Sequence, residues 1–277
     1  MVRKKSSELS RIKLSVALAT FNEEKNLEQC LKGVKGIADE IAVVDGSSSD
    51  ETVKIAQSLG ARVMITTNKP IFHINKQQAI DECRGEWILQ LDADEIITPE
   101  LAEEIRGIVD HPDQAQLPNA FLIKRKKMFL GQWIEKGGQY PDPVIRFFKK
   151  GKARLPCENV HEQMATEGKV GWLKNPLIHL STPSFAVYLT KDNRYSSLTA
   201  QELKEKKVSL SGWSCLNYGL WQPVKTFFSL FIRHRGFQDG FPGFVFAFYS
   251  GLHHFTAYAK YWEMEKDGQV DLSKDWV

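Results

Sequence analysis

The sequence predicts an α/β fold, in which a doubly wound, mostly parallel sheet is followed by a C-terminal helical extension. Three observations support this prediction. Four short apolar runs alternate with amphipathic stretches between Met1 and Asp110, a pattern typical of βαβ units. The chain has 277 residues, of which 42% are hydrophobic, and this is enough for one large core. From Trp213 onward, aromatic residues are frequent in stretches that have helical spacing.

The elements of the first half follow from its apolar runs and its turn residues. Strands are expected at residues 14–19, 41–44, 61–66 and 87–91, and helices at residues 27–34, 52–59, 75–83 and after residue 98. Asn22 is a good N-cap residue for the first helix. Ser48 and Glu51 have the spacing of a capping box for the second helix. Thr98 and Pro99 are typical of a helix start and predict the fourth helix.

Polar residues follow three of the predicted strands, at 20–23, 45–48 and 92–95. Right-handed crossovers place the carboxyl ends of parallel strands at one edge of a sheet, where ligands bind. Asp92 and Asp94 are two positions apart, so on an extended chain both point to the same side. Two neighbouring carboxylates repel each other and suit Mg²⁺ or Mn²⁺, which combine one or two carboxylates with substrate phosphates. The alternative is an acidic turn that only caps the next helix.

Other features of the sequence exclude several classes. It contains neither G-x-G-x-x-G after the first strand nor G-x-x-x-x-G-K-[ST], so a dinucleotide oxidoreductase or P-loop NTPase is not expected. The four cysteines are far apart, which argues against a zinc knuckle or a disulfide framework and favours a reducing cytosol. The segment from Met1 to Lys13 is polar and basic and lacks the apolar core of a signal peptide. No apolar run is long enough to span a bilayer, so no transmembrane helix is expected.

Charge and pattern change after Asp110. The segment from Met1 to Asp110 has a net charge of −5 and the remainder +8, which suits an anionic partner for the second part, such as lipid headgroups, a phosphorylated glycan or nucleic acid. Strands are expected at 120–129, interrupted by the basic run 124–127, and at 144–148 and 177–180, with a long helix within 184–207. Two further helices, at 221–232 and 241–262, combine aromatic with basic residues and suit a membrane interface. A helical hairpin packed on the domain, or an oligomer contact, is the alternative.

Several of these segments resemble the family-2 nucleotide-sugar glycosyltransferases with the GT-A fold, over roughly residues 12–262. Residues 19–24, 43–50 and 85–95 carry the resemblance to the family. Residues 140–142, 146–148 and 160–162 look like signatures of the bacterial lipopolysaccharide-core glucosyltransferases. The resemblance implies a GT-A catalytic domain over 12–182, with a nucleotide-sugar half at 12–110 and an acceptor half at 111–182. A helical, membrane-associating extension would follow at 183–277.

The resemblance also implies roles for individual residues. The nucleotide-sugar would be bound by Ala19, Thr20, Phe21, Glu23, Asp45, Lys76, Asp92 and Ala93. Asp92, Asp94 and His161 would hold a Mn²⁺ or Mg²⁺ ion. Lys76 would approach the diphosphate, although a solvated helix lysine is the alternative. Gly46 stands where the family often has a second acid, so the contact of Asp45 with base or ribose stays open.

The implied chemistry is a single displacement that inverts the configuration of the transferred sugar. A carboxylate takes the proton of the acceptor hydroxyl; Glu162 is the first candidate, Glu158 the second and Asp142 the third. Arg146 is expected to pair with Asp92 or Glu162, or to bind an acceptor phosphate. Arg146 and Asp142 are also candidates for a contact with the acceptor or the diphosphate. A single histidine is more often structural, and His179 is expected to anchor the junction between a strand and a helix.

Taken together, the resemblance implies an inverting, metal-dependent transfer of a hexose, with UDP-glucose as the first candidate donor. The acceptor would be a lipopolysaccharide core or a related glycan at the inner face of the cytoplasmic membrane, and no nucleic-acid partner is expected. A lipid-linked, polyisoprenyl-phosphate or protein acceptor is an alternative. A nucleotidyltransferase would carry a Gly-rich basic loop near the first strand, which residues 20–24 lack. A non-catalytic membrane- or nucleic-acid-binding protein would leave Asp92 and Asp94 unexplained.

Overall fold

The computed structural model describes residues 12–158 and 163–266. The chain divides into two compact units. The first contains the chain up to Arg125 together with Pro143–His179, and the second contains Lys126–Asp142 together with the chain from Leu180 onward. Where the sequence predicts a boundary between residues 182 and 183, the division falls between His179 and Leu180, and the segment Lys126–Asp142 joins the second unit.

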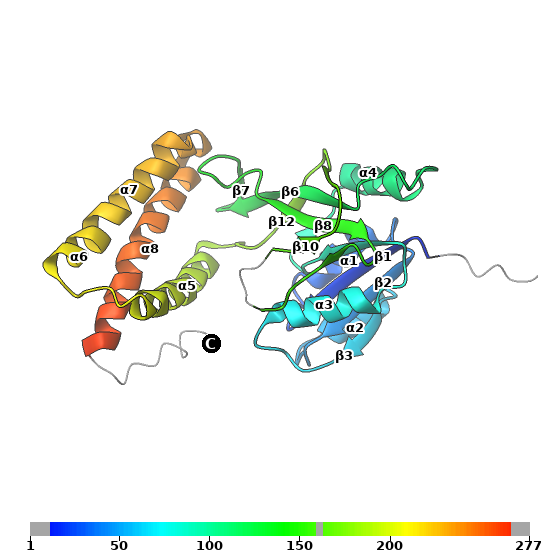
Figure 1. The fold of residues 1–277 in the computed structure, drawn as a ribbon, viewed down its shortest axis with the longest axis horizontal. Helices are drawn as coiled ribbons and strands as arrows, with labels where there is room; N and C mark the ends of the chain where they lie inside the picture. Colours follow the sequence, from blue (N-terminus) through cyan, green and yellow to red (C-terminus); the bar gives the residue numbers. More distant parts are fainter. Residues whose placement is uncertain (1–11, 159–162, 267–277) are drawn as a thin grey trace, which may run out of the picture. The chain divides into compact units, whose positions relative to one another are not determined.

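A mostly parallel sheet organises the first unit (Figure 1). Its parallel strands are β1 (Leu14–Thr20), β2 (Glu40–Asp45), β3 (Arg62–Ile65) and β4 (Trp87–Leu91), in the order β3-β2-β1-β4. Next to β4 lies the antiparallel β8 (Pro143–Lys149), and β6 (Ala120–Phe129) pairs with β8. The predicted α/β class, with a doubly wound and mostly parallel sheet, is confirmed.

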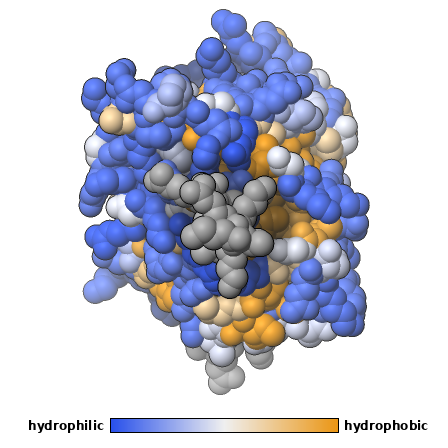
Figure 2. All heavy atoms as spheres, turned by 90° about the vertical axis from the view of Figure 1, so that its right-hand side faces the viewer, coloured by the Kyte–Doolittle hydropathy of each residue, from blue (hydrophilic) through white to orange (hydrophobic). Residues whose placement is uncertain are grey.

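Helices cover both faces of this sheet, as the alternation of strand side chains requires. Leu14, Val16 and Leu18 of β1 belong to one core cluster with residues of α1 (Leu27–Val34), α2 (Thr52–Ser58) and α4 (Pro99–Val109). Ala17 points to the other face and shares a second cluster with residues of α3 (Phe72–Glu82). Hydrophilic residues predominate on the face that Figure 2 shows, with smaller hydrophobic areas between them.

Apart from β6 and β8, the strands that follow β4 are shorter and less regular. They are β5 (Glu95–Ile96), β7 (Gln132–Ile134), β9 (Ala153–Arg154), β10 (Ala165–Thr166), β11 (Val170–Trp172) and β12 (Leu177–His179). The prediction that the basic run interrupts β6 is wrong. The backbone of β6 pairs with β8 as far as Lys124 and with β7 from Lys127 onward, and ladder hydrogen bonds do not depend on side-chain charge.

Two predicted helix caps are also wrong. Asn22 has a φ of 56° and precedes the N-cap of α1, which is Asn26. The Ser48 hydroxyl does not cap α2, because it donates to the carboxylate of Asp45 at 2.6 Å instead. The cap of α4 is confirmed, since the Thr98 hydroxyl accepts the amide of Leu101 at 3.2 Å.

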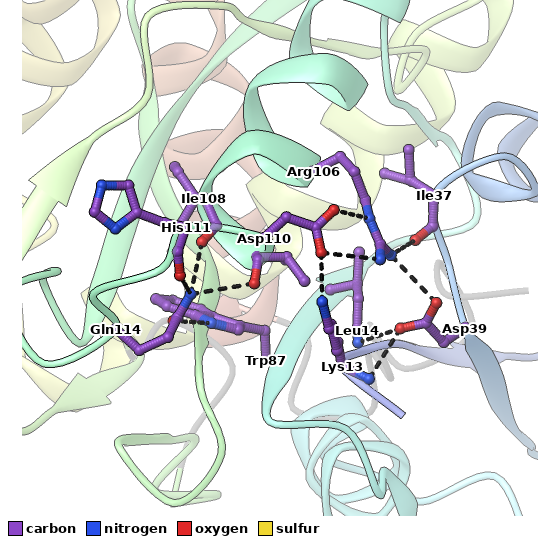
Figure 3. A network of polar contacts seen from close by, with 11 residues as sticks. Lys13, Leu14, Ile37, Asp39, Trp87, Arg106, Ile108, Asp110, His111 and Gln114 are labelled. Atoms are coloured by element: carbon purple, nitrogen blue, oxygen red, sulfur yellow. Dashed lines mark hydrogen bonds and ion pairs between the residues drawn. The ribbon is translucent and has the colours of Figure 1, made fainter. Parts of the chain in front are cut away.

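A polar network joins β1, the segment before β2 and the end of α4 (Figure 3). The carboxylate of Asp39 accepts the amides of Lys13 and Leu14, both at 2.9 Å, and the guanidinium of Arg106 at 3.2 Å. Asp110 bonds to Arg106 at 2.8 Å and to Lys13 at 2.7 Å. These residues adjoin the amino ends of β1 and β2, so the network fastens the edge of the sheet opposite to the one where these strands end.

Helices make up most of the second unit. They are α5 (Phe185–Glu205), α6 (Gly212–Leu216), η1 (Asn217–Trp221), α7 (Gln222–Phe228), η2 (Ser229–Arg233), η3 (Gly236–Asp239) and α8 (Gly240–Lys266). The predicted long helix is α5, which begins after its N-cap Ser184. α8 packs against α5 and α7. Among the residues that the structure describes, no helix is long and apolar enough to cross a membrane.

Candidate active site

The first two strand ends are bound to each other through one carboxylate. The strand register places Thr20 beside Asp45, and the Thr20 hydroxyl donates to the Asp45 carboxylate at 2.8 Å. The Ser48 amide donates to the same carboxylate at 2.8 Å, and the Ser48 hydroxyl accepts the amide of Asn22 at 2.8 Å. Asp45 is fully buried. It therefore holds the loops after β1 and β2 together at the edge of the sheet.

The third strand end presents Asp92 between two cationic side chains. Lys76 of α3 lies 2.5 Å from Oδ1 of Asp92, and Nη2 of Arg146 on β8 lies 2.5 Å from Oδ2. Burial by itself would raise the pKa of Asp92, but Arg146 and Lys76 outweigh it and hold that pKa well below its usual range. Asp92 is therefore an anion at neutral pH. The cationic partner that the paired carboxylates require is supplied here by the protein itself.

Arg146 is the buried centre of this cluster. Only 8% of the residue is exposed, and its guanidinium also donates to Oε1 of Glu95 at 2.9 Å and to the side-chain oxygen of Gln90. Burial lowers the pKa of Arg146, but Asp92 and Glu95 raise it above its ordinary value, so the charge is retained. Glu95 is fully buried, and Arg125 approaches it at 3.7 Å.

Asp94 lies beside a different partner. Its Oδ2 is 3.4 Å from Nε2 of His179, and His179 is the register partner of Glu95 in the pairing of β12 with β5. The sequence predicts His179 as a structural anchor, whereas the structure brings it to Asp94. Asp92 is thus paired with Lys76 and Arg146, and Asp94 lies beside His179.

The turn that contains Asp92 rests on the first helix. The Cys30 thiol of α1 donates to the backbone carbonyl of Asp92 at 3.6 Å. Burial raises the pKa of the Cys30 thiol well above its ordinary value, and the carboxylates of Glu95, Asp92 and Asp94 raise it further. The thiol therefore stays protonated and acts as a donor below the turn.

The remaining residues expected to bind the nucleotide-sugar lie near the same strand ends. Phe21 is 43% exposed, Ala19 is half-buried and Ala93 is buried. The carboxylate of Glu23 accepts the side-chain amide of Asn26 at 2.9 Å. These placements are compatible with the expected roles, which stay predictions.

The described residues include only some of the expected acceptor-side residues. Glu162 and His161 lie outside the described residues. Glu158 is exposed at the end of the segment before them. Asp142 belongs to the second unit, where its carboxylate pairs with Lys127 at 3.0 Å. The general base therefore stays open between Glu162, Glu158 and Asp142.

The side chains fit a divalent ion only if the substrate completes the site. In the described part of the chain, no group of three or more His, Cys, Asp or Glu residues could hold a metal. Mg²⁺ in phosphate-binding sites usually needs only one or two carboxylates, because phosphates and water supply the other ligands. Asp94 and Asp92 match that smaller requirement, provided that Lys76 releases Oδ1 of Asp92. A metal shared with a diphosphate is therefore compatible with this site.

Residues that the sequence interpretation did not assign to the site are Gln90, Glu95 and Arg125. Gln90 carried a signal, because it is a polar residue within an otherwise apolar and fully buried strand. In the sequence, Glu95 is only a third acid after the strand. Its carboxylate accepts the backbone amide of Asp92 at 3.0 Å, and this contact depends on the turn. Arg125 comes from β6, so only the sheet pairing brings it near.

Comparison with known proteins identifies relatives of the chain. The family model described as Glycosyl transferase family 2 matches residues 15–159. An uncharacterized glycosyltransferase of Rickettsia typhi is 30% identical over 274 residues, which cover 95% of this chain and 91% of that protein. The lipopolysaccharide core biosynthesis glycosyltransferase LpsC of Rhizobium meliloti is 26% identical over 272 residues, covering 92% and 94% respectively.

Solved structures show a more distant likeness. S. aureus TarS 1–349 in complex with UDP-GlcNAc has 17% sequence identity to this chain and a TM-score of 0.47, and the match covers 93% of each chain.

Proposed function

Because this chain belongs to glycosyltransferase family 2, we propose that it transfers a hexose from a nucleoside-diphosphate sugar to a glycan acceptor, with inversion of configuration. The chain is an enzyme with the GT-A-like fold. Enzymes of this family bind nucleotide-sugar donors and often use a divalent metal. Our first candidate donor is UDP-glucose.

One observation supports this proposal above the others. Three loops at the carboxyl ends of parallel strands converge, and Asp92 lies there between Lys76 and Arg146. Ligands of such sheets bind at this edge. The region that matches the family, residues 15–159, contains all three loops. An anionic donor would find a cationic side chain, Lys76, beside the carboxylates that can share a metal with it.

In the proposed reaction, the acceptor oxygen attacks the anomeric carbon from the face opposite the diphosphate. A bond forms between these two atoms, and the bond from the anomeric carbon to the diphosphate oxygen breaks. A carboxylate on the acceptor side, Glu162 first and Glu158 second, takes the hydroxyl proton as general base. Phe21 and Ala19 would line the base and ribose, and Asp45 would hold the loops around them.

Lys76 would contact the diphosphate and neutralise part of its charge. Asp94 and Asp92 would hold a Mn²⁺ or Mg²⁺ ion, which when bound would stabilise the departing diphosphate by charge. Lys76 must leave Oδ1 of Asp92 for that, and the incoming diphosphate gives its ammonium group another anionic partner. Arg146 and Glu95 would keep the Asp92 turn in place meanwhile.

For the acceptor, we propose a lipopolysaccharide core or a related glycolipid. The name of the Rhizobium meliloti relative and the basic excess after Asp110 support this choice. We further propose that the helices after residue 183 bind the inner face of the cytoplasmic membrane from the aqueous side. Large apolar side chains are exposed on these helices, including Trp213, Trp221 and Phe241. A protein or a polyisoprenyl-phosphate acceptor is the second candidate.

A donor screen with metal titration tests this proposal. Purified protein is incubated with UDP- and GDP-sugars, and nucleotide release is followed with each sugar, with and without a core-oligosaccharide acceptor. Release that depends on one donor, on the acceptor and on Mn²⁺ or Mg²⁺ is expected. Absence of release with every donor and acceptor would refute the proposal.

Asp94→Asn tests the metal role in the same preparation. Ligand binding to the native state raises the melting temperature, so UDP should raise it in the wild type only when Mn²⁺ is present. The variant should lose this metal-linked shift, because Asn supplies no anionic ligand. A shift of unchanged size in the variant would remove Asp94 from the metal site.

A further inference from the structure

The guanidinium of Arg146 faces inward toward protein groups. Its Nη2 lies 2.5 Å from Asp92 and 2.9 Å from Glu95, and its Nη1 donates to Gln90. Only 8% of the residue is exposed. These three acceptors occupy the forked end of the side chain, which is suited to several fixed acceptors at once. Nε is buried and has no hydrogen-bond partner among the described residues. A contact of Nη1 or Nη2 with an acceptor phosphate or a diphosphate, which the sequence left open for Arg146, would therefore compete with these three acceptors.

The partners of Arg146 are also bound to each other, so the cluster closes on itself. The second carboxylate oxygen of Glu95 accepts the backbone amide of Asp92 at 3.0 Å. The side-chain amide of Gln90 donates to the carbonyl of Leu91 at 2.9 Å and lies 3.3 Å from Oδ1 of Asp92. Both the backbone and the side chain of Asp92 are therefore fixed by groups that Arg146 contacts.

Lys76 differs from Arg146 in this respect. Its ammonium group pairs with Asp92 alone among the described carboxylates, and its second neighbour is the ring of Phe72 at 4.7 Å. A lysine with one ionic partner on a flexible stem can exchange that partner for a diphosphate. Arg146 would have to leave three acceptors, two of which, on Glu95 and Gln90, belong to fully buried residues. The two cations therefore have separate tasks.

We infer that Arg146 is a positioning residue that itself contacts no substrate. It fixes the Asp92–Glu95 turn in the position in which Asp92 and Asp94 contact the donor. The inference rests on the proposed transferase function. The fixed turn matters because a misplacement of about 1 Å in a reacting geometry can lower a rate by about 100-fold.

Arg146→Lys tests the inference, with Arg106→Lys as the matched control. Arg106 also bridges two carboxylates, Asp110 and Asp39, but in the network at the amino ends of β1 and β2. Each variant keeps the positive charge and loses the fork. Both should lower the melting temperature. Only Arg146→Lys should lower kcat, by about 100-fold. It should also reduce the Mn²⁺-dependent rise in melting temperature that UDP causes. The kcat values are measured at a temperature at which every variant is folded.

Two outcomes would overturn the inference while the wild type remains active. One is a kcat for Arg146→Lys within about threefold of the wild type, which is well below the loss expected for a displaced group. The other is an equal loss of kcat in Arg106→Lys, since the effect would then follow stability. A wild type that transfers no sugar would instead refute the proposed function, and this inference with it.

A second variant covers the case in which Arg146→Lys does not fold. Removing Arg146 alone leaves Glu95 as a buried charge without its closest cation, which is costly, whereas removing both charges together is often tolerated. The double variant Arg146→Gln with Glu95→Gln keeps Asp92 paired with Lys76. We expect it to fold and to have a kcat about 100-fold below that of the wild type. A kcat of the double variant within about threefold of the wild type would overturn the inference.

Discussion

Arg146 and Lys76, the two cationic partners of Asp92, differ in the number of acceptors that they contact. Their side chains are exposed to a similar small extent, 10% for Arg146 and 12% for Lys76. Arg146 contacts three acceptors, whereas Lys76 pairs only with Asp92 among the ionic contacts that the described residues make. Both lower the pKa of Asp92, and the charge of Arg146 does so more strongly than the charge of Lys76. Arg146 remains in contact with Asp92 when Lys76 leaves. A donor diphosphate can therefore take Lys76 without neutralising Asp92.

Lys76→Met should weaken donor binding more than it weakens the fold. A charge-assisted hydrogen bond contributes about 1.5–3 kcal/mol, so the KM for the donor should rise by about 10- to 100-fold, as initial rates over a donor series would measure. Arg146 still neutralises Asp92 in the variant. Lys32→Met is the control, because Lys32 pairs with Glu28 on an exposed face of α1, where ion pairs contribute little. An unchanged KM would exclude Lys76 from the diphosphate site.

The sequence predicts the local part of this site and misses its long-range part. The prediction of Asp92 and Asp94 comes from an apolar strand that ends in acids, and that of Lys76 comes from the resemblance to the family. The contact of Arg146 with Asp92 was one of several options. Gln90 and Glu95 join the cluster through a turn and an antiparallel strand, β8, whose pairing with β4 is not encoded in any local pattern. Residue spacing therefore could not reveal which acid Arg146 contacts.

At the scale of elements, strands were easier to predict than the loops at their ends. β1, β2 and β4 are nearly continuous apolar runs because both faces of the sheet are covered, and this pattern is specific to such strands. Ser48 was predicted as a helix cap because it has the right spacing. The structure uses it to hold Asp45, since a buried carboxylate needs hydrogen-bond donors more than the helix needs a cap.

Substitution of Asp39 tests how much the polar network at the amino ends of β1 and β2 stabilises the fold. Asp39→Asn keeps the shape of the side chain but replaces one acceptor oxygen by an NH₂ donor. This donor then faces either the amides of Lys13 and Leu14 or the guanidinium of Arg106. At neutral pH the free energy of unfolding should therefore fall by about 1–2 kcal/mol. Urea unfolding measures it. Glu28→Gln, which removes only the exposed pair with Lys32, should change the stability by a few tenths of a kcal/mol at most, roughly.

The effect of Asp39→Asn should also depend on pH in one direction. Burial would raise the pKa of Asp39, but the amides of Leu14 and Lys13 and the charge of Arg106 together lower it. A carboxylate with a lowered pKa in the folded state stabilises the fold above its unfolded pKa, about 3.9, and this contribution is lost as the pH falls further. The difference between wild type and variant should therefore shrink below about pH 4. A constant difference down to about pH 2 would contradict this account.

At the scale of the whole molecule, the two units have different surfaces. The first buries its apolar residues in two clusters on the faces of a sheet. The second has a groove of about 590 Å³ along α6, η1 and α7, lined almost wholly by apolar side chains. Exposed basic residues are Lys225 on α7, Arg233 at the end of η2 and Arg235 just before η3. Aromatic and basic side chains together suit the interface of an anionic bilayer.

The full-length double variant Trp213→Ser with Trp221→Ser should bind anionic liposomes at least about tenfold more weakly than the wild type, because each ring buried in lipid contributes more than about 1 kcal/mol. Trp213 and Trp221 are 77% and 62% exposed. Flotation with vesicles that contain phosphatidylglycerol measures the bound fraction, which should also fall as salt screens the basic residues. Trp172→Ser is the control, since Trp172 is 53% exposed but belongs to β11 of the first unit.

Undiminished flotation of the double variant, or an equal loss in the control, would refute membrane binding through these helices. A loss of self-association in the double variant, without any change in flotation, would identify the groove as a contact between copies of the chain.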